Sequence, residues 1–342
     1  MKAARIHQHG GADALVYQDV PDPSLRPDHV LVRVRACALN HLDLFVRTGI
    51  PGIRIPLPRI LGSDIAGEVR AAGKLCDRIK PGQRVLLSPG LSCGQCEACL
   101  SGRDNLCRRY QVFGYHVDGG YAELVAAPEY SVIPIPDGLP FEEAAAVPLV
   151  FLTAWHMVMS RARLQPGEDV LILAASSGVG SAAIQIARLF QCRIIATAGS
   201  EEKMAKARAL GADHVIHHYQ SDIAAEVKRL TDRRGVDVVV EHVGAATWQK
   251  SLDSLAPGAR IVTCGATTGF DTRLDLRYLF SKQWSLLGSY MGSMGELHQV
   301  LKFIFRGQLK AVIDRTYPLA EARAAHARLE QKEQFGKIVL TI

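Results

Sequence analysis

Residues 170–187 read VLILAASSGVGSAAIQIA, an apolar run that passes through a glycine turn into an apolar pattern of helical spacing. The run from Val170 to Ala174 predicts a buried strand, and the pattern from Val179 to Phe190 predicts a helix. Amides at the start of such a helix can face a phosphate group. The stretch therefore predicts the first strand, turn and helix of a dinucleotide-binding fold.

The segments around this stretch continue the alternation. From Pro140 onward, apolar strands such as RIIATA and VDVVVE alternate with helical segments, which predicts a doubly wound α/β domain with a parallel sheet. Up to about residue 135 the apolar runs are short and β-rich, which predicts a β-barrel-like domain. After Trp284, a strand SLLGSY and a helix near 296–306 lead to the tail FGKIVLTI, whose alternation suggests a strand returning to the first domain.

The glycine turn departs from the usual fingerprint. Ala175, Ser177 and Gly180 stand at the three glycine positions of G-x-G-x-x-G, so two of the three glycines are replaced. A glycine-rich turn alone is often only a tight connection, but its place between a strand and a helix favours dinucleotide binding. We expect Ser177, Gly178, Val179 and Gly180 to contact the cofactor.

The end of the next strand bears on the choice of dinucleotide. NAD-binding folds place an acid here to hold the ribose hydroxyls, whereas this chain has Ala198. Gly199, Ser200 and Lys203 open a pocket for a 2′-phosphate, with Tyr219 a further contact, so NADPH is favoured. In the alternative interpretation Ser200 simply caps the following helix. Because acids stand at 201 and 202, NADH stays an alternative cofactor.

Four of the eight cysteines lie in CGQCEACLSGRDNLC. Four thiolates complete the tetrahedron that Zn²⁺ prefers and leave no open position, so one structural zinc is predicted rather than a catalytic one. Disulfides are the weaker alternative, because neither a signal peptide nor another paired cysteine spacing is visible. The predicted ligands are Cys93, Cys96, Cys99 and Cys107.

The length, charge and hydropathy of the chain argue against a nucleic-acid-binding or membrane-spanning protein. The chain has 342 residues, enough for two domains, and a net charge of +6 that is spread along it rather than gathered in a basic block. We therefore expect no nucleic-acid partner, and no apolar run is long enough to predict a membrane span. The sequence predicts a cytoplasmic enzyme acting on a small molecule.

The order of these motifs resembles the medium-chain dehydrogenase/reductases, a family of zinc alcohol dehydrogenases, quinone oxidoreductases and enoyl reductases. The resemblance covers nearly the whole chain and includes LVRVRACALNHLDLFVRTG, LPRILGSDIAGEV, GGYAEL, AAAVPLVFLTAW and ASSGVG. It implies a GroES-like catalytic domain over 1–130, completed by about 290–342, a Rossmann domain over 131–289, and a cleft where they meet. It also implies a homodimer or homotetramer, with SLLGSYM as the candidate edge strand.

Alcohol dehydrogenases of this family hold a second, catalytic zinc. The corresponding positions here are Asn40, Ser63 with Asp64, and one near Leu149, which do not make the usual ligand set. Among these residues and their neighbours, only His41 and Asp64 have side chains that could bind a catalytic zinc. Leu42 stands where the family's alcohol dehydrogenases have the hydroxyl residue of their proton relay. The resemblance therefore implies a zinc-free mechanism.

The replacements LNHLD and GSD look like those of the zinc-free quinone and enoyl reductases. Their acceptors take hydride without a metal when the protein stabilises the developing oxyanion. We expect Asn40 to make that contact, Asp43 to orient its loop and Thr153 to line the site; the proton donor is unassigned, because Phe45 stands where some relatives have Tyr. Further cofactor-lining positions implied by the resemblance are Gly244, Gly265 and Ser289, beside Glu241 and His242.

The sequence thus predicts an NADPH-preferring reductase of quinones or α,β-unsaturated carbonyl compounds with one structural zinc. One alternative is an alcohol dehydrogenase with an atypical zinc site. A second is a non-catalytic dinucleotide-binding protein, which the replaced glycines and the missing proton donor would favour.

Overall fold

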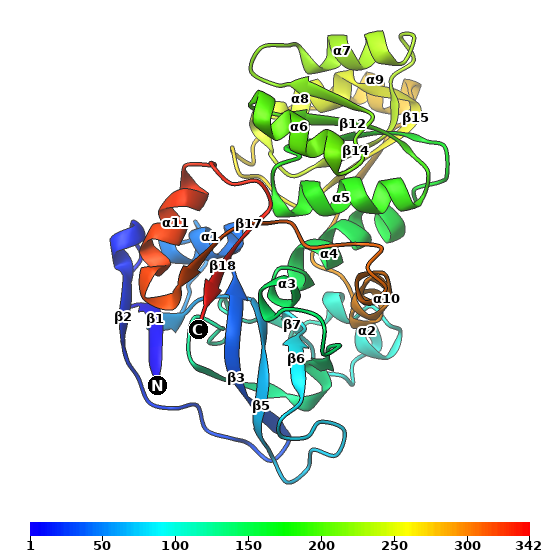
Figure 1. Cartoon of the computed structure of the whole chain (residues 1–342). Helices are drawn as coiled ribbons and strands as arrows, with labels where there is room; N and C mark the ends of the chain where they lie inside the picture. The colour runs from blue at the N-terminus through cyan, green and yellow to red at the C-terminus, as the bar shows by residue number, and fades with distance from the viewer. The chain divides into compact units, whose positions relative to one another are not determined.

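The computed structural model describes all residues, 1–342, and the chain forms two compact units (Figure 1). Unit 1 consists of Met1–Leu149 and Ser293–Ile342, and unit 2 of Val150–Gly292. The first division therefore lies later in the chain than the boundary expected at residue 130. The reason is that the segment after 130 packs on unit 1: strand β10 (Val132–Pro134) pairs with β6 (Arg84–Leu87), and helix α3 (Phe141–Ala145) contacts the same sheet.

Unit 2 is built on a six-stranded parallel sheet in the order β13-β12-β11-β14-β15-β16. The order reverses between β11 and β14, which is the point where doubly wound folds bind their ligands. The strands are β11 (Asp169–Ile172), β12 (Arg193–Ala198), β13 (His214–His217), β14 (Val236–Glu241), β15 (Leu255–Thr263) and β16 (Ser285–Gly288). The helices are α4 (Pro148–Trp155), whose first two residues belong to unit 1, then α5 (Gly178–Leu189), α6 (Glu201–Ala209), α7 (Ile223–Leu230), α8 (Ala245–Asp253) and α9 (Leu276–Ser281).

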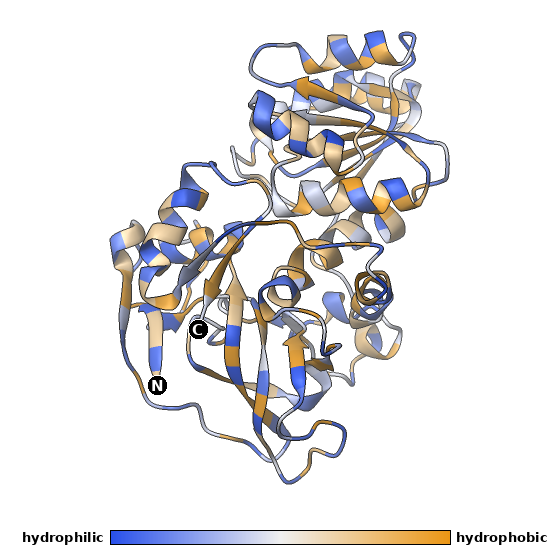
Figure 2. Cartoon of the chain, viewed as in Figure 1, coloured by the Kyte–Doolittle hydropathy of each residue, from blue (hydrophilic) through white to orange (hydrophobic).

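The sheet of unit 2 is apolar on both faces. Strands β11 and β14 are buried almost throughout, as expected for parallel strands covered on two sides. Figure 2 shows strands of this sheet, such as β14, mainly in the hydrophobic colour, whereas the helices mix both colours. Helices α5, α7 and α8 are amphipathic, and the buried apolar residues of α7 and α8 pack with the strands in the core of unit 2.

Unit 1 is a mainly antiparallel β structure. Its largest sheet runs β10-β6-β5-β3-β18-β17, with β9 also paired to β3, and two small sheets, β2-β1-β4 and β7-β8, lie outside it. Its other strands are β1 (Lys2–Ile6), β2 (Leu15–Asp19), β3 (His29–Ala38), β4 (Arg59–Ile60), β5 (Asp64–Ala72), β7 (Gly90–Leu91), β8 (Gln111–Val112), β9 (Leu124–Pro128), β17 (Ile313–Pro318) and β18 (Lys337–Thr341). Its other helices are α1 (His41–Thr48), α2 (Glu97–Leu100), α10 (Met294–Phe305) and α11 (Ala322–Glu330).

The last strand, β18, returns to the sheet of unit 1 as the alternation in the tail suggests. It pairs antiparallel with β3 and parallel with β17, and Val339 lies opposite Ala38. Figure 1 shows this red strand beside the blue β3. The end of the chain is thus a central strand of a sheet begun near the start of the chain.

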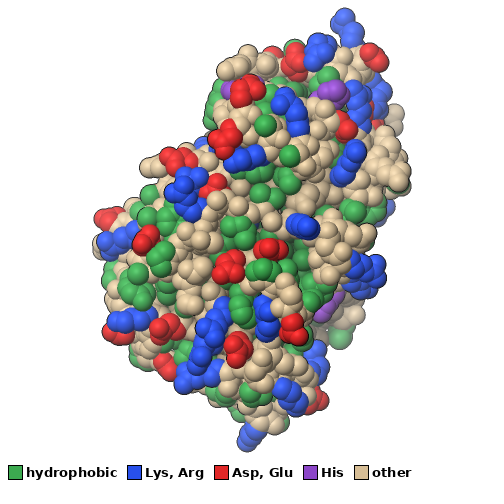
Figure 3. Space-filling model, in the orientation of Figure 1, with side chains coloured by type: hydrophobic (Ala, Val, Ile, Leu, Met, Phe, Trp, Pro, Cys, Tyr) green, Lys and Arg blue, Asp and Glu red, His purple; other side chains and the backbone are tan.

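Charges on the surface are mixed in sign. On the face shown in Figure 3, Lys and Arg side chains lie among Asp and Glu side chains rather than in one block. No helix of the chain is both long enough and apolar enough to span a bilayer.

A buried polar chain joins α1 to α11 in unit 1. The Arg47 side chain is fully buried, and its Nη1 lies 3.2 Å from Nδ1 of His326. A guanidinium only donates, so Nδ1 accepts and the neutral ring carries its proton on Nε2, which donates to the Tyr121 hydroxyl at 3.1 Å. Burial, with a smaller contribution from Arg47, lowers the pKa of His326 from its usual 6.5 to about 3.

We predict that His326 makes the stability of unit 1 dependent on pH. Unfolded histidine takes up a proton below about pH 6.5, whereas folded His326 does so only near pH 3, so its contribution is present above pH 6.5 and is lost as the pH falls. A His326→Gln variant can still accept from Arg47 and donate to Tyr121 but does not titrate. Between pH 7.5 and 5.5, the unfolding free energy of the unsubstituted chain should fall by about 1.4 kcal/mol more than that of the variant, measured by urea titration. Equal pH dependence in both would contradict the neutral buried ring.

Candidate active site and metal sites

Asn40 lies in unit 1 at the junction between β3 and α1 and is buried, with 6% of its surface exposed. Its neighbour Asp43 accepts two backbone hydrogen bonds, from Asn40 N at 2.7 Å and from Gly62 N at 2.9 Å. Burial raises the pKa of Asp43 to about 6, although these amides oppose the rise. Gly62 has φ +96°, and a Cβ there would lie 2.4 Å from the Tyr121 ring. Asp43 therefore connects the start of α1 to the loop at Gly62, a position where only glycine fits.

A buried ionic cluster surrounds the Asn40 side chain. Lys337 Nζ donates to Asn40 Oδ1 at 2.6 Å and to Asp64 Oδ2 at 2.8 Å, and Asn40 Nδ2 donates to the same Asp64 oxygen at 2.9 Å. The other oxygen, Asp64 Oδ1, accepts from Leu149 N at 2.7 Å. Asp64 is fully buried and Lys337 is 4% exposed. We call Asn40, Asp64 and Lys337 the amide–ion cluster.

This cluster does not suit a catalytic zinc at the positions that the resemblance indicates. Both Asp64 oxygens and the Asn40 amide are engaged, and an ammonium group stands among them. Ser63 Oγ donates to Phe113 O at 2.8 Å instead of facing a metal. The residues present therefore do not fit a second zinc, which would need three protein ligands and an open position.

The four cysteines predicted to hold a structural zinc do come together in unit 1. Cys93, Cys96, Cys99 and Cys107 place their sulfurs within 4.8 Å of one another, and they form the one group of three or more His, Cys, Asp or Glu residues in the chain that is arranged to hold a metal. Sulfurs that share one zinc at about 2.3 Å lie about 3.8 Å apart in a tetrahedron. The Cys93–Cys99 and Cys96–Cys99 separations, 3.8 and 3.5 Å, suit this geometry, and none of the eight cysteines forms a disulfide.

The predicted dinucleotide turn lies at the start of α5 in unit 2. Ser177 caps the helix, its Oγ accepting from Gly180 N at 2.8 Å, and Gly178 and Val179 form the first turn. A Cβ at Gly180 would lie 2.4 Å from Ala174 O, so glycine is required there for the close approach of strand and helix. The third fingerprint glycine therefore keeps its role in close helix–strand packing, although the other two are replaced.

Ser177 also contacts His242, which follows β14. Its Oγ lies 2.9 Å from His242 Nε2, and burial lowers the pKa of His242 to about 4, so the ring is neutral. His242 Nδ1 and the hydroxyl of Ser289, beyond β16, are buried without a partner. Two unpaired polar groups at the carboxyl ends of these strands accord with a polar ligand at this edge of the sheet.

The end of β12 leads into a helix cap at Ser200. Ser200 Oγ accepts from Lys203 N at 3.3 Å and so caps α6, which confirms the capping role. Ala198, the last residue of β12, occupies the place of the acid and is buried, while the acids Glu201 and Glu202 lie in the first turn of α6. Tyr219 is 77% exposed and lies against Gly199, where a Cβ would come within 2.7 Å of its ring.

The remaining predicted residues of unit 2 lie at helix and strand ends. Thr153 is buried in α4, Gly244 caps α8 with φ +96°, and Gly265 packs beside His242. Glu241 is fully buried and accepts from Val243 N, Gly244 N and the hydroxyls of Thr247 and Ser251. Glu241 therefore closes the turn after β14, as a structural residue would.

Two residues of these sites are absent from the sequence-based prediction. Lys337 is the only charged residue in the apolar run FGKIVLTI. A single lysine in a strand that is otherwise expected to be buried is unusual, and this could have indicated a functional or paired residue. His218 packs beside Gly199, where a Cβ would lie 2.9 Å from its Nε2, and burial lowers its pKa. No spacing rule distinguishes His218 from its neighbour His217.

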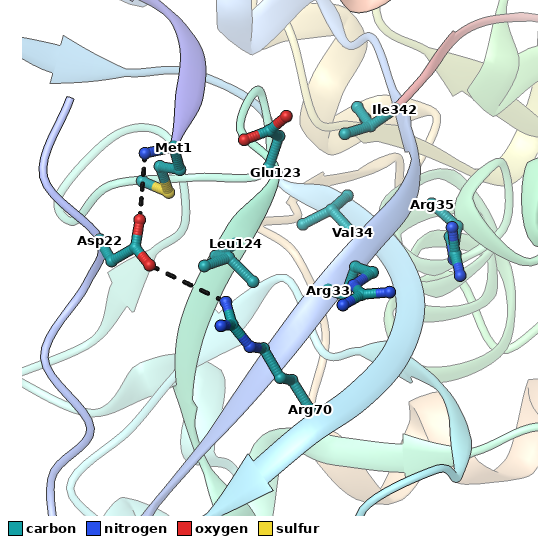
Figure 4. A pocket seen from close by; sticks show the side chains of 9 residues that line it. All are labelled: Met1, Asp22, Arg33, Val34, Arg35, Arg70, Glu123, Leu124 and Ile342. Carbon is teal, nitrogen blue, oxygen red and sulfur yellow. Dashed lines mark hydrogen bonds and ion pairs between the residues drawn. The ribbon is translucent and has the colours of Figure 1, made fainter. Parts of the chain in front are cut away.

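Unit 1 also has a surface hollow of about 470 Å³ that contains none of the predicted site residues (Figure 4). Arg33 and Arg35 from β3 and Arg70 from β5 line it. Asp22 pairs with the Met1 amine at 3.0 Å and with Arg70 at 3.8 Å. Asp22 thus pairs with Arg70, but the lining has only two acids, Asp22 and Glu123, against three arginines and the Met1 amine.

Comparison with known proteins agrees with both units. Residues 26–137 match the alcohol dehydrogenase GroES-like domain, and residues 178–306 match the zinc-binding dehydrogenase family. A quinone oxidoreductase from Pseudomonas aeruginosa is 34% identical over 99% of both chains. An NAD-dependent alcohol dehydrogenase from Sulfolobus acidocaldarius is 31% identical over the full length of both.

A solved structure titled NAD-dependent alcohol dehydrogenase superposes with a TM-score of 0.96 at 47% identity and covers all of both chains. The expected combination of a GroES-like domain and a Rossmann domain is therefore confirmed. On these matches the chain belongs to the medium-chain dehydrogenase/reductase family.

Proposed function

We propose that the protein is an NADPH-preferring oxidoreductase that transfers hydride to a quinone or an α,β-unsaturated carbonyl compound, with one structural zinc and no catalytic zinc. The observation that carries this proposal is the amide–ion cluster. Its Asn40, Asp64 and Lys337 satisfy one another at the positions where a second zinc would need ligands. A quinone or an enone is electrophilic enough to accept hydride without a Lewis acid.

The nicotinamide cofactor, when bound, supplies the hydride. What the protein must add is a hydrogen-bond donor at the acceptor oxygen, where negative charge develops as the hydride reaches carbon. Asn40 has a second Nδ2 hydrogen besides the one given to Asp64, and it is our candidate donor. Asp43 accepts from Asn40 N and Gly62 N and so orients the loop. Thr153, buried in α4, stays a predicted site residue of unit 2.

For the cofactor, we propose NADPH ahead of NADH. Support comes from Ala198 in place of an acid and from a polar edge of Gly199, Ser200, Lys203 and Tyr219. The capping oxygen of Ser200 keeps its own hydrogen, which can be donated to a phosphate. His218, packed beside Gly199, adds a further polar group to this edge.

A second candidate is an alcohol dehydrogenase that uses NAD. It is favoured by the 47% identical structure with that title and by the Sulfolobus relative. A non-catalytic dinucleotide-binding protein is the third candidate, supported by the replaced fingerprint glycines. The first two candidates differ in their substrates and in their zinc content. The third differs from both because it turns over no substrate.

We predict that the purified protein oxidises NADPH faster than NADH with quinones, enones or enals, and has no comparable activity with simple alcohols. The physical reason is that its Asn40 site offers a hydrogen bond but no Lewis acid. The measurement is a spectrophotometric screen of both cofactors over quinones, enals, enones, enoyl-CoA thioesters, aldehydes and alcohols, with metal analysis of the same sample.

About one zinc per chain and activity on conjugated acceptors would agree with the proposal. Two zincs per chain, with activity confined to alcohols and aldehydes and lost to a mild chelator, would favour the alcohol dehydrogenase. Tight NADPH binding without turnover of any acceptor would favour the non-catalytic protein.

We predict that the four-cysteine group holds one zinc that stabilises unit 1 without taking part in the reaction. A Cys107→Ser variant should lose most of the zinc and melt at least about 5 °C lower, because the metal's binding energy contributes to folding. NADPH binding, which belongs to unit 2, should persist. The matched control is Cys76→Ser, a half-buried cysteine outside the group, which should keep full zinc; zinc retained in Cys107→Ser would contradict this site.

We propose a homodimer, or a homotetramer built from such dimers, formed through strand β16. This strand pairs only with β15, so its other edge is free, and Leu276, Tyr278 and Phe280 nearby are 64%, 55% and 71% exposed. An open strand edge with apolar neighbours favours pairing with a second copy.

In solution we therefore predict a mass at least twice that of one chain. A Leu287→Lys variant places a charge on the edge strand and should shift the protein toward monomer, measured by light scattering. Leu75→Lys, at a 70% exposed leucine of unit 1, is the control that should leave the mass unchanged. A monomeric unsubstituted protein would rule out this assembly.

We also propose a cytoplasmic location. Its support is the set of eight unpaired cysteines, which suits a compartment that keeps thiols reduced.

A further inference from the structure

The side chain of Lys337 is a buried charge that the proposed reaction does not yet use. It comes from β18, it is 4% exposed, and its Nζ contacts Asn40 Oδ1 at 2.6 Å and Asp64 Oδ2 at 2.8 Å. A buried ammonium group is costly unless it is paired and hydrogen-bonded. Asp64 supplies the opposite charge, so neutralising the ammonium group does not require the contact between Lys337 and Asn40.

That contact determines which way the Asn40 amide faces. Oδ1 accepts from the ammonium group and Nδ2 donates to the carboxylate of Asp64. With the amide reversed, its NH₂ would face the Lys337 ammonium and its oxygen would face the Asp64 carboxylate. The two charges together therefore permit only one orientation, and in it the free group of Asn40 is an N–H.

The strands bring these three residues together with little freedom. Strand β3 is flanked by β5 and β18, and Ala38 pairs with Asp64 on one side and with Val339 on the other. Asp64 is also held by Leu149 N at 2.7 Å, which prevents its carboxylate from turning. A rigid sheet thus supports the orientation of Asn40.

We propose that Lys337 is a positioning residue that, with Asp64, holds Asn40 as a hydrogen-bond donor toward the acceptor oxygen. The part concerning the acceptor rests on the proposed function. The part concerning the orientation of Asn40 rests only on the contacts within unit 1, and the two can be tested separately.

The orientation can be tested by NMR without any activity, because the chain has only two asparagines, Asn40 and Asn105. Protein labelled with ¹⁵N-asparagine gives two side-chain amide pairs, and the pair lost in Asn40→Ser identifies Asn40. In the unsubstituted chain, the Asn40 pair should be well separated in ¹H shift and slow to exchange with solvent. In Lys337→Met its exchange should be at least about tenfold faster, because one of its two charged partners is gone.

The catalytic role is tested with four variants. Lys337→Met leaves the Asp64 carboxylate buried without a cation, so a lower melting temperature is expected as well as a lower kcat. The double variant Asp64→Asn/Lys337→Met is neutral and should regain stability while kcat stays about 10- to 100-fold down, with the dissociation constant for NADPH unchanged. Lys337→Arg, which keeps the charge and several donors, should restore most of kcat. Lys74→Met, at an exposed lysine of the same unit, is the charge-matched control and should match the unsubstituted chain throughout.

The outcomes separate the two parts of the proposal. An Asn40 amide pair unchanged in Lys337→Met would overturn the positioning role, whatever the activity. A double variant that recovers both stability and kcat would show that Lys337 serves folding alone, and would also overturn it. Absence of activity with every acceptor in the unsubstituted chain would defeat the proposed function, while the amide signals would still decide whether Lys337 orients Asn40.

Discussion

The main sheet of unit 1 contains a buried ion pair between Asp64 and Lys337, which are 273 residues apart in the chain, and the arrangement around Asn40 depends on it. Both groups are buried, so neither can be satisfied by water, and each requires the other in place. The pair can form only when the final strand β18 has joined β3, since Lys337 belongs to that strand. Completion of the sheet and neutralisation of the two charges are therefore one event.

This constraint also shapes the chemistry of the site. A carboxylate and an amide at these positions could in principle face a cation from solvent, but here the cation is a side chain of the same unit. The metal-binding capacity of the chain is instead concentrated in the four-cysteine group, whose thiols lie within 4.8 Å of one another. Thus the protein keeps a site suited to a structural zinc while the candidate catalytic position relies on hydrogen bonds.

Several features were predictable because they depend on residues close in sequence. The turn at Ser177 and Gly180, the cap at Ser200 and the clustering of the four cysteines each involve contacts that span only a few residues. Local spacing and side-chain chemistry are enough to predict such contacts. The boundary between the units, which lies after Leu149 rather than near residue 130, was less predictable, because it depends on α3 packing against distant strands of unit 1.

The sequence by itself determined the fold class, the family, the four thiols, the helix cap at Ser200 and the presence of Asn40 where a metal ligand is usual. Only the tertiary structure decided what Asn40 does with its amide, since its partners come from β5 and from the end of the chain. The same holds for Tyr121 and His326, which meet across 205 residues. Hydrogen-bond direction and burial are properties of groups brought together by folding, and no local pattern encodes which distant partner a polar side chain will meet.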